Sequence, residues 1–223
     1  MIKGVIIDFN GTLYLDHDLN RKAWNDTFDE VKPKGSKAVY TDVRRDDLAN
    51  DYMLCDAILR YFNLPVNDEI IYQMSERKEK EYRELAMSQN RNKLVEGTEE
   101  FLDYIKNNKI PYCIASMAPR SNFDFYLDYL KLNKWFTYDN IVYDNGDYTT
   151  KNQQLLDAAK RMNLDIKDCL IIEDTANNIK WAIEKLKAEK FIYINTKKVE
   201  YISKEILQVI NDYTELDYSI FTK

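Results

Sequence analysis

Histidine, glycine, proline and cysteine are all scarce in this chain of 223 residues. The single histidine, His17, excludes a zinc site built from a histidine cluster, and any Ser–His or Cys–His mechanism would have to use it. The three cysteines, Cys55, Cys113 and Cys169, offer neither a CxxC spacing nor an even set for disulfides, so we expect buried thiols. Chemistry in this chain must therefore come from carboxylates, lysines and hydroxyls.

The chain also lacks a long apolar run and a basic tract. Its mean hydropathy is −0.57, and without a long apolar run a transmembrane helix is excluded. The apolar start ends at Asp8, too soon for a signal peptide. The 32 basic and 38 acidic residues give a net charge of −6, the opposite of the balance that sequence-independent nucleic-acid binding needs. We expect a cytoplasmic protein without nucleic-acid or membrane partners, present as a monomer or weak dimer.

What is present is an alternation of apolar runs and helical patterns. Five apolar runs bounded by polar or turn residues predict buried strands. These runs are residues 2–7, 110–115, 139–143, 169–172 and 191–194. Apolar residues at helical spacing predict helices over residues 101–105, 179–186 and 199–210, with Thr98 as the N-cap of the first. The alternation of strand and helix predicts an α/β fold with a doubly wound parallel sheet.

Residues 16–92 interrupt this alternation with an all-helical insert. Helical patterns lie near residues 18–31, 45–62 and 67–90, with no convincing strand. The third pattern carries charged pairs such as Glu79/Arg83 at helical spacing, so we expect a long, solvated helix there. This organisation predicts a core made of residues 1–15 and 93–223, with residues 16–92 forming a helical cap domain over it.

Side chains that can do chemistry follow four of the predicted strands. They are Asp8, Ser116, Lys151 and the pair Glu173-Asp174, in chain order. Ligands of open α/β sheets bind beyond the carboxyl ends of the strands. These residues therefore offer a carboxylate, a hydroxyl, an ammonium and a carboxylate pair at one edge of the sheet.

Each of these residues also has a purely structural alternative. The alternatives are a turn started by Asp8 at Asn10-Gly11, helix caps at Ser116 and at Asp174 or Thr175, and an exposed position for Lys151. Lys151 fits its alternative least, because a cation at a helix N-terminus opposes the macrodipole unless an anion is held nearby. Together the alternatives require four coincidences in chain order, which favours a shared site.

These segments resemble the motifs of the haloacid dehalogenase superfamily of phosphoryl-transfer enzymes, in the subgroup of β-phosphoglucomutase and phosphoglycolate phosphatase. Asp8-x-Asn10-Gly11-Thr12 resembles the nucleophile motif, and Ser116, Lys151 and Glu173-Asp174 resemble the second, third and fourth motifs. The resemblance covers the whole chain, including the helical segment between the first two motifs. It implies a Rossmann-like core with an inserted helical cap.

The resemblance implies a role for each of these residues. Asp8 would attack phosphorus and form an aspartyl-phosphate, while Ser116 and Lys151 would bind the phosphoryl oxygens. Mg2+ prefers oxygen ligands, and its ligands would be Asp8, Glu173, Asp174 and the main-chain carbonyl of Asn10. Further substrate-binding residues would be Phe9 and Gly11, through backbone N–H groups, with Thr12, Met117 and the cap residue Arg45.

Several positions depart from the family pattern or have two readings. Phosphatases and mutases of this family carry a second Asp at the position of Asn10, which protonates the leaving oxygen and then activates water. An amide does neither, and general acid–base catalysis contributes about 10²–10⁴-fold. Asn20 stands where β-phosphoglucomutase-like enzymes carry a histidine, so a mutase is not expected. Arg45 either grips a distal phosphate or is a solvated surface residue, and His17 is either a substitute acid or a linker residue.

We therefore expect a Mg2+-dependent phosphomonoester hydrolase that acts on a small phosphorylated metabolite and is weakened by Asn10. One alternative is a non-catalytic regulatory protein that binds a phosphorylated ligand between core and cap. A phosphosugar mutase is the other. The cap that would select the substrate carries no readable code, so the sequence does not identify the substrate.

Overall fold

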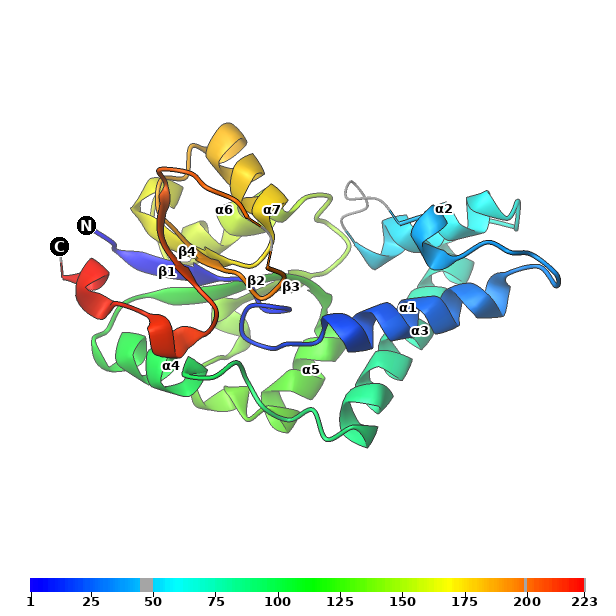
Figure 1. The fold of residues 1–223 in the computed structure, drawn as a ribbon, viewed down its shortest axis with the longest axis horizontal. Helices are drawn as coiled ribbons and strands as arrows, with labels where there is room; N and C mark the ends of the chain where they lie inside the picture. Colours follow the sequence, from blue (N-terminus) through cyan, green and yellow to red (C-terminus); the bar gives the residue numbers. More distant parts are fainter. Residues whose placement is uncertain (45–49, 199, 223) are drawn as a thin grey trace.

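A six-stranded parallel sheet forms the centre of the computed structural model, which describes residues 1–44, 50–198 and 200–222. The strands are β1 (Gly4–Ile7), β2 (Tyr112–Pro119), β3 (Ile141–Asp144), β4 (Cys169–Glu173), β5 (Phe191–Ile194) and β6 (Ile206–Ile210). Their order is β3-β2-β1-β4-β5-β6, and every neighbouring pair is parallel (Figure 1). From β1 the chain first adds β2 and β3 toward one edge and then β4, β5 and β6 toward the other, as in a doubly wound sheet.

Helices cover both faces of this sheet because its central strands are apolar on both sides. In β1, Val5 and Ile7 join one hydrophobic cluster, with Phe101, while Ile6 between them joins the other, with Leu155. The covering helices are α4 (Thr98–Asn107), α5 (Arg120–Tyr129), α6 (Lys151–Arg161) and α7 (Ala176–Trp181), which continues as a π-helix over Ala182–Leu186. Short 3-10 helices occur at Tyr40–Asp42, Leu132–Lys134, Tyr138–Asn140, Ile166–Asp168, Tyr213–Glu215 and Tyr218–Phe221. The expected α/β core is confirmed.

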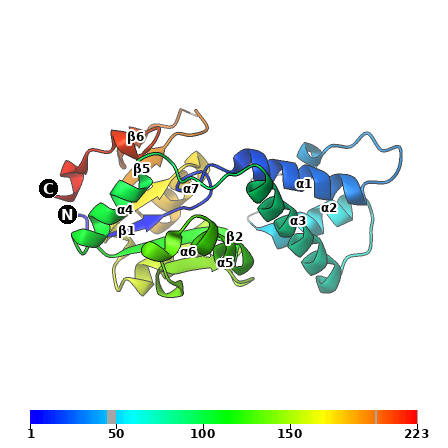
Figure 2. The ribbon, with the colours of Figure 1, turned by 90° about the horizontal axis from the view of Figure 1, so that it is seen from below.

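Three helices between β1 and β2 form a cap beside the sheet (Figures 1 and 2). They are α1 (His17–Val31), α2 (Asp51–Tyr61) and α3 (Asp68–Ser88). They share a hydrophobic cluster of their own around Trp24, Phe28 and Ile58. The side chains of Asn50 and Asn67 cap α2 and α3 by accepting backbone N–H groups of the first turn. No described helix combines the length and apolarity needed to cross a membrane.

Two segments connect the cap to the core, and they are hydrogen-bonded to each other. Val95 N donates to the carbonyl oxygen of Leu13 (2.9 Å), and the Tyr14 hydroxyl donates to that of Arg91 (2.6 Å). The guanidinium of Arg91 donates in turn to the carbonyl oxygen of Leu15 (2.5 Å). We call these paired segments, residues 13–15 and 91–95, the connecting strip. The cap limits at residues 16 and 92 remain a prediction.

The segment after β5 contradicts the sequence prediction of a helix over residues 199–210. Ile202, expected on the buried face of that helix, is 92% exposed, and the segment ends in β6. Ile206 and Ile210 are four residues apart, a spacing that places two side chains on one face of a helix and equally of a strand. Pairing with β5 selects the strand, and residue 199 lies outside the described residues.

Smaller differences concern the limits of the predicted elements. The first three strands begin two residues later than predicted, at Gly4, Tyr112 and Ile141. The N-cap of α4 is Gly97 rather than Thr98. Gly97 has a φ of 75°, and a Cβ there would lie 2.7 Å from a backbone nitrogen, so glycine suits this position. The three cysteines are buried free thiols, as expected.

Helix α3 is not solvated throughout, contrary to its charge pattern. Lys78 and Glu79 are each only 2% exposed. The Lys78 ammonium lies 2.6 Å from the Glu79 carboxylate, 3.3 Å from that of Asp51 and 4.8 Å from the ring centre of Trp24. Burial alone would raise the pKa of Glu79, but the charge of Lys78 and the hydrogen bonds to Glu79 together outweigh burial and hold this pKa at about 2. We call Asp51, Lys78 and Glu79 the cap charge cluster.

Replacing Lys78 with Met should destabilise the protein strongly, because the buried carboxylate of Glu79 and the partly exposed one of Asp51 would lose the cation between them. Breaking one partner of a buried ion pair costs about 3–5 kcal/mol. The exposed neighbour Lys80 provides the control, since Lys80→Met should change the free energy of unfolding by less than about 0.5 kcal/mol. Urea unfolding measures both variants, and equal free energies would contradict the structural role of Lys78.

Candidate active site

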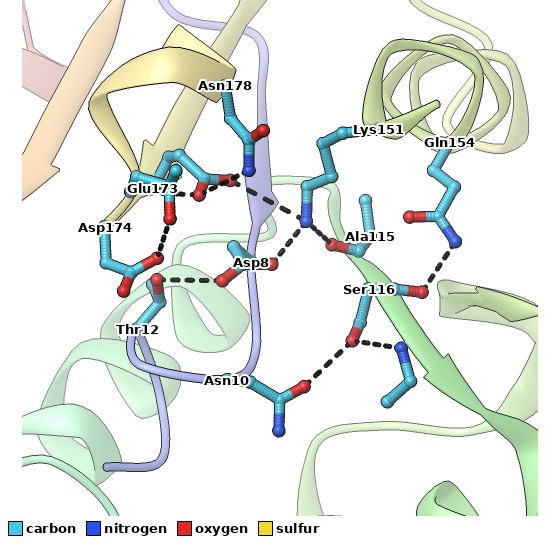
Figure 3. Close-up of polar contacts among 12 residues, drawn as sticks. Asp8, Asn10, Thr12, Ala115, Ser116, Lys151, Gln154, Glu173, Asp174 and Asn178 are labelled. Carbon is cyan, nitrogen blue, oxygen red and sulfur yellow. Dashed lines mark hydrogen bonds and ion pairs between the residues drawn. The ribbon is translucent and has the colours of Figure 1, made fainter. Parts of the chain in front are cut away.

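The carboxyl ends of β1, β2 and β4 bring together the polar side chains expected there (Figure 3). Asp8 follows β1, Ser116 lies in β2, Glu173 ends β4, and Lys151 begins α6. Their exposed fractions are 8%, 1%, 2% and 6%. Because parallel strands end at the same edge, residues far apart in the sequence converge here. The catalytic roles of these residues remain predictions.

Asp8 and Lys151 form the central ion pair of the site. The Lys151 ammonium donates to Asp8 Oδ1 and to the carbonyl oxygen of Ala115, and it lies 3.7 Å from Glu173 Oε2. The Thr12 hydroxyl donates to the other carboxylate oxygen of Asp8 at 3.1 Å. Lys151 is therefore not an exposed surface lysine, and both oxygens of Asp8 are held in place.

Three carboxylates lie close together in this part of the site. Ligand atoms of Asp8, Glu173 and Asp174 all lie within 4.8 Å of one another. Burial raises the pKa of Asp8 above its usual range in spite of Lys151, and burial together with the charge of Asp8 raises the pKa of Glu173 to about 8. Burial and the mutual repulsion of the carboxylates therefore disfavour their ionised forms more than Lys151 favours them. Oxygen donors with excess negative charge fit a divalent cation such as Mg2+.

Asp174 differs from the other two carboxylates because two basic side chains face it. Its Oδ2 lies 3.0 Å from His17 Nε2 and 2.9 Å from Lys197 Nζ. Burial would raise the pKa of Asp174, but His17 and Lys197 outweigh it and hold this pKa at about 2. His17 begins α1 rather than lying in a linker. Lys197 was missed, although it stands shortly after the fifth predicted strand, the same signal that identified the other residues of the site.

Ser116 belongs to the site rather than to a helix cap. Its hydroxyl donates to Asn10 Oδ1 (3.2 Å) and accepts from Ala118 N (3.1 Å). The carbonyl oxygen of Ser116 accepts from Gln154 Nε2 at 2.6 Å, which fixes the end of β2 against α6. The N-cap of α5 is Pro119, so the capping alternative for Ser116 is wrong.

The side-chain amide of Asn10 takes part in a network that joins core and cap. Its Nδ2 donates to Asp16 Oδ2 (2.6 Å) and to the Tyr126 hydroxyl (3.2 Å). Tyr82 of α3 donates to the same oxygen of Asp16 (2.6 Å) and accepts from the Tyr126 hydroxyl (2.9 Å). Burial raises the pKa of Asp16 to about 6. No local pattern predicts this network, because Tyr126 is 116 residues from Asn10.

The remaining residues expected to bind substrate occupy different positions. Met117 lines the cavity described below. Phe9 and Thr12 are fully buried, so their side chains pack beneath the surface of the site. Gly11 has a φ of 84°, and its N–H donates within its own turn (2.7 Å), so it is not available to a phosphate. Arg45 lies outside the described residues.

A cavity of about 610 Å3 lies between core and cap, with Asp8 in its wall. This volume is typical of small-molecule sites. From the core it is lined by Asn10, Ser116, Met117, Lys151, Glu173 and Asp174, and from the cap by Asn20, Trp24, Tyr40 and Tyr82 with the cap charge cluster. The cavity thus places a ligand between the Asp8–Lys151 pair and the cap helices.

Comparisons with known proteins agree with this arrangement. Residues 2–209 match the family model described as haloacid dehalogenase-like hydrolase. The chain is 24% identical over 182 residues to the chloroplastic 5-amino-6-(5-phospho-D-ribitylamino)uracil phosphatase of Arabidopsis thaliana. The aligned segment covers 80% of this chain and 46% of that protein. The chain therefore spans about half the length of this curated relative.

Solved structures show the same fold at low identity. A haloacid dehalogenase-type hydrolase of family IA, variant 3, from Entamoeba histolytica superimposes with a TM-score of 0.79 and 24% identity, covering 98% of this chain and 96% of that one. The β-phosphoglucomutase of Clostridium difficile gives a TM-score of 0.75 and 21% identity over 100% and 96% of the two chains. Since the family model spans nearly the whole chain and includes all four motif segments, this protein belongs to the haloacid dehalogenase-like hydrolases.

Proposed function

We propose that this protein is a Mg2+-dependent phosphomonoester hydrolase that acts on a small phosphorylated metabolite through an aspartyl-phosphate on Asp8. The observation that carries the proposal is a buried carboxylate, held by Lys151 and Thr12, in the wall of a cavity between core and cap. Membership of a hydrolase family and similarity to a phosphatase support it.

In the proposed mechanism, Asp8 attacks phosphorus while the bond between phosphorus and the ester oxygen breaks. Lys151 and Thr12 hold the two carboxylate oxygens, so the nucleophile needs no reorientation before attack. Lys151 also reduces the repulsion between Asp8 and an approaching dianion. Ser116, whose hydroxyl now donates to Asn10, would turn to a phosphoryl oxygen. Water then hydrolyses the aspartyl-phosphate and returns Asp8 as a carboxylate.

The proposed Mg2+ ligands are the carboxylates of Asp8 and Asp174 and the carbonyl of Asn10, with Glu173 beside them. When bound, the ion supplies charge stabilisation for the phosphoryl oxygens. The raised pKa values of Asp8 and Glu173 support a cation here, because their negative charge is incompletely compensated. To bind a cation, Asp174 would exchange its contacts with His17 and Lys197.

Asn10 limits the reaction because an amide cannot protonate the leaving oxygen or activate water. The loss corresponds to about 10²–10⁴ in rate. The hydrolase would then act best on acyl or aryl phosphates, whose leaving groups need little protonation. His17 lines the same cavity and lies against Gly11, next to Asn10, while its Nε2 is 3.0 Å from Asp174; its role as a substitute acid stays a prediction.

The second candidate function is a non-catalytic protein that binds a phosphorylated ligand. The observation that favours it is the state of Asn10, whose amide is hydrogen-bonded at both ends and ties the core to the cap. A phosphosugar mutase is less well supported, because Asn20 lines the cavity where a histidine would be expected.

Hydrolysis of a panel of phosphate esters with Mg2+ separates the two functions, with the Asp8→Asn variant as the blank. Turnover that depends on Asp8 supports the hydrolase. Binding of inorganic phosphate without Asp8-dependent turnover of any ester supports the binding protein.

Replacing Asp174 with Ala should abolish the thermal stabilisation that Mg2+ gives to the protein. Ligand binding to the native state raises Tm by mass action, so loss of a ligand carboxylate removes the shift. Glu189→Ala, which removes an exposed carboxylate elsewhere, should keep the full shift. Thermal unfolding with and without Mg2+ measures both, and an unchanged shift in Asp174→Ala would rule out the proposed metal site.

Replacing Asn10 with Asp should raise the hydrolysis of alkyl phosphates by roughly one to several orders of magnitude. The new carboxyl group would protonate the leaving oxygen and activate water, a contribution of about 10²–10⁴. Aryl phosphates should gain least because their leaving groups need no proton. Equal rates for both proteins on an alkyl phosphate would mean that another residue already supplies the proton.

The same substitution should destabilise the protein, because it replaces the donor that faces Asp16 at 2.6 Å with a second carboxyl group. Leaving a buried acceptor without its donor costs about 1–3 kcal/mol. The double variant Asn10→Asp/Asp16→Asn restores an amide–carboxylate pair with the partners exchanged, and most of the stability should return. Denaturant unfolding of the wild type, both single variants and the double variant measures this coupling, and strictly additive changes would refute it.

A further inference from the structure

The cap side of the cavity carries charges that the proposed mechanism does not use. Its charged groups in the described residues include the cap charge cluster, of which Lys78 and Glu79 are buried, and the buried Asp16. Trp24 and Tyr40, with nearly parallel rings 6.0 Å apart, and Tyr82 add aromatic surface. A leaving group held between Asp8 and the cap would meet these residues, so their charge restricts its chemistry.

The buried cation of this wall, Lys78, is already compensated. Its ammonium lies 2.6 Å from Glu79 Oε1 and 3.3 Å from Asp51 Oδ2, and its own side chain is 3% exposed. Glu79 is saturated as well, since its Oε2 accepts from Asn122 Nδ2 of the core at 2.5 Å. Lys78 therefore has no free charge to offer a second phosphate or a carboxylate.

Asp51 is the accessible member of the cluster. Its side chain is 21% exposed and lines the cavity, whereas the side chains of Lys78 and Glu79 are 3% exposed. Burial, reinforced by Glu79, raises the pKa of Asp51 well above its usual range in spite of Lys78. The cluster carries a formal charge of −1 with both acids ionised and zero with one protonated. In neither state does it attract an anion.

We propose that the leaving group of the substrate lies against the cap charge cluster, is uncharged or cationic, and directs a hydroxyl or amino group at Asp51. A polyol or amino-polyol monophosphate has this chemistry, and the aromatic surface suits its CH faces. Because such a substrate is an alkyl phosphate, Asn10 would make its hydrolysis slower than that of an aryl phosphate. A second phosphate or a carboxylate would face Asp51 and is rejected. This substrate class rests on the proposed function.

Two arginines of the cap bear on this inference. Arg44 lines the cavity but is exposed, so water and salt screen its charge more than that of a buried group. Arg45 lies outside the described residues, and its expected grip on a distal phosphate predicts the opposite preference. A binding experiment decides between these two opposite ligand preferences.

The experiment measures binding to the full-length Asp8→Asn variant by calorimetry in buffer with Mg2+, so that no ester is consumed. The ligands form a matched six-carbon series: glucose 6-phosphate, glucosamine 6-phosphate, 6-phosphogluconate and fructose 1,6-bisphosphate, with inorganic phosphate as the reference. The uncharged and cationic leaving groups should bind at least about tenfold more tightly than the two anionic ones. Equal or tighter binding of either anionic ester overturns the proposal, as does binding of all four no tighter than inorganic phosphate.

A second variant assigns the preference to Asp51. Adding Asp51→Asn to the Asp8→Asn variant removes the carboxylate charge but keeps a carbonyl acceptor. The preference for the uncharged and cationic esters over the anionic esters should then shrink several-fold. Asp56→Asn, the same change on α2 outside the cavity, should leave the preference unchanged. An equal effect of both substitutions overturns the role of Asp51, and the wild-type ranking stands as a test even if Asp51→Asn fails to fold.

These outcomes are separate from those that test the proposed function. The binding series needs no turnover, so the preference can fail while Asp8-dependent hydrolysis of an aryl phosphate succeeds. Conversely, the expected ranking without hydrolysis of any ester would retain the ligand class and reject the hydrolase.

Discussion

The burial of three carboxylates beside two lysines, Lys151 and Lys197, is the constraint on which the candidate site depends. Removing charged groups from water is costly, and Lys151 offsets only part of that cost for Asp8 and Glu173. The sheet makes the arrangement possible, because three neighbouring strands end beside one another and hold the groups on rigid backbone. The same crowding of carboxylates that destabilises the free site would favour the binding of a divalent cation.

Most of the core could be predicted from the sequence because its signals are local. Apolar runs specify the buried strands, and parallel strands must end at one edge, so Asp8, Ser116, Lys151 and Glu173 had to converge. The prediction of a helix over residues 199–210 was wrong for an equally local reason. Apolar residues four positions apart lie on one face of a helix and also of a strand, and the strand β6 depends on pairing with β5.

The rest of the site could not be predicted because it depends on contacts between distant segments. Asp16, Tyr82 and Tyr126 meet Asn10 only once the cap is folded onto the core. The charge pattern of α3 was misleading for the same reason, since Glu79 faces Asn122 of the core rather than solvent. Asn10 consequently belongs both to the candidate site and to the junction with the cap, so we expect a substitution there to affect the proposed chemistry and the docking of the cap together.

The connecting strip determines how the cap can move. Two chain segments that are hydrogen-bonded side by side cannot slide independently, so we expect any displacement of the cap to be mainly a rotation about an axis along the strip. Under such a rotation, points near the axis barely move and points far from it sweep widely. Residue 16 adjoins the strip, so the surroundings of Asn10 keep their spacing while the far end of the cavity widens. A ligand would then enter from the far, widened end of the cavity. At the end near the connecting strip it would meet residues whose spacing does not change.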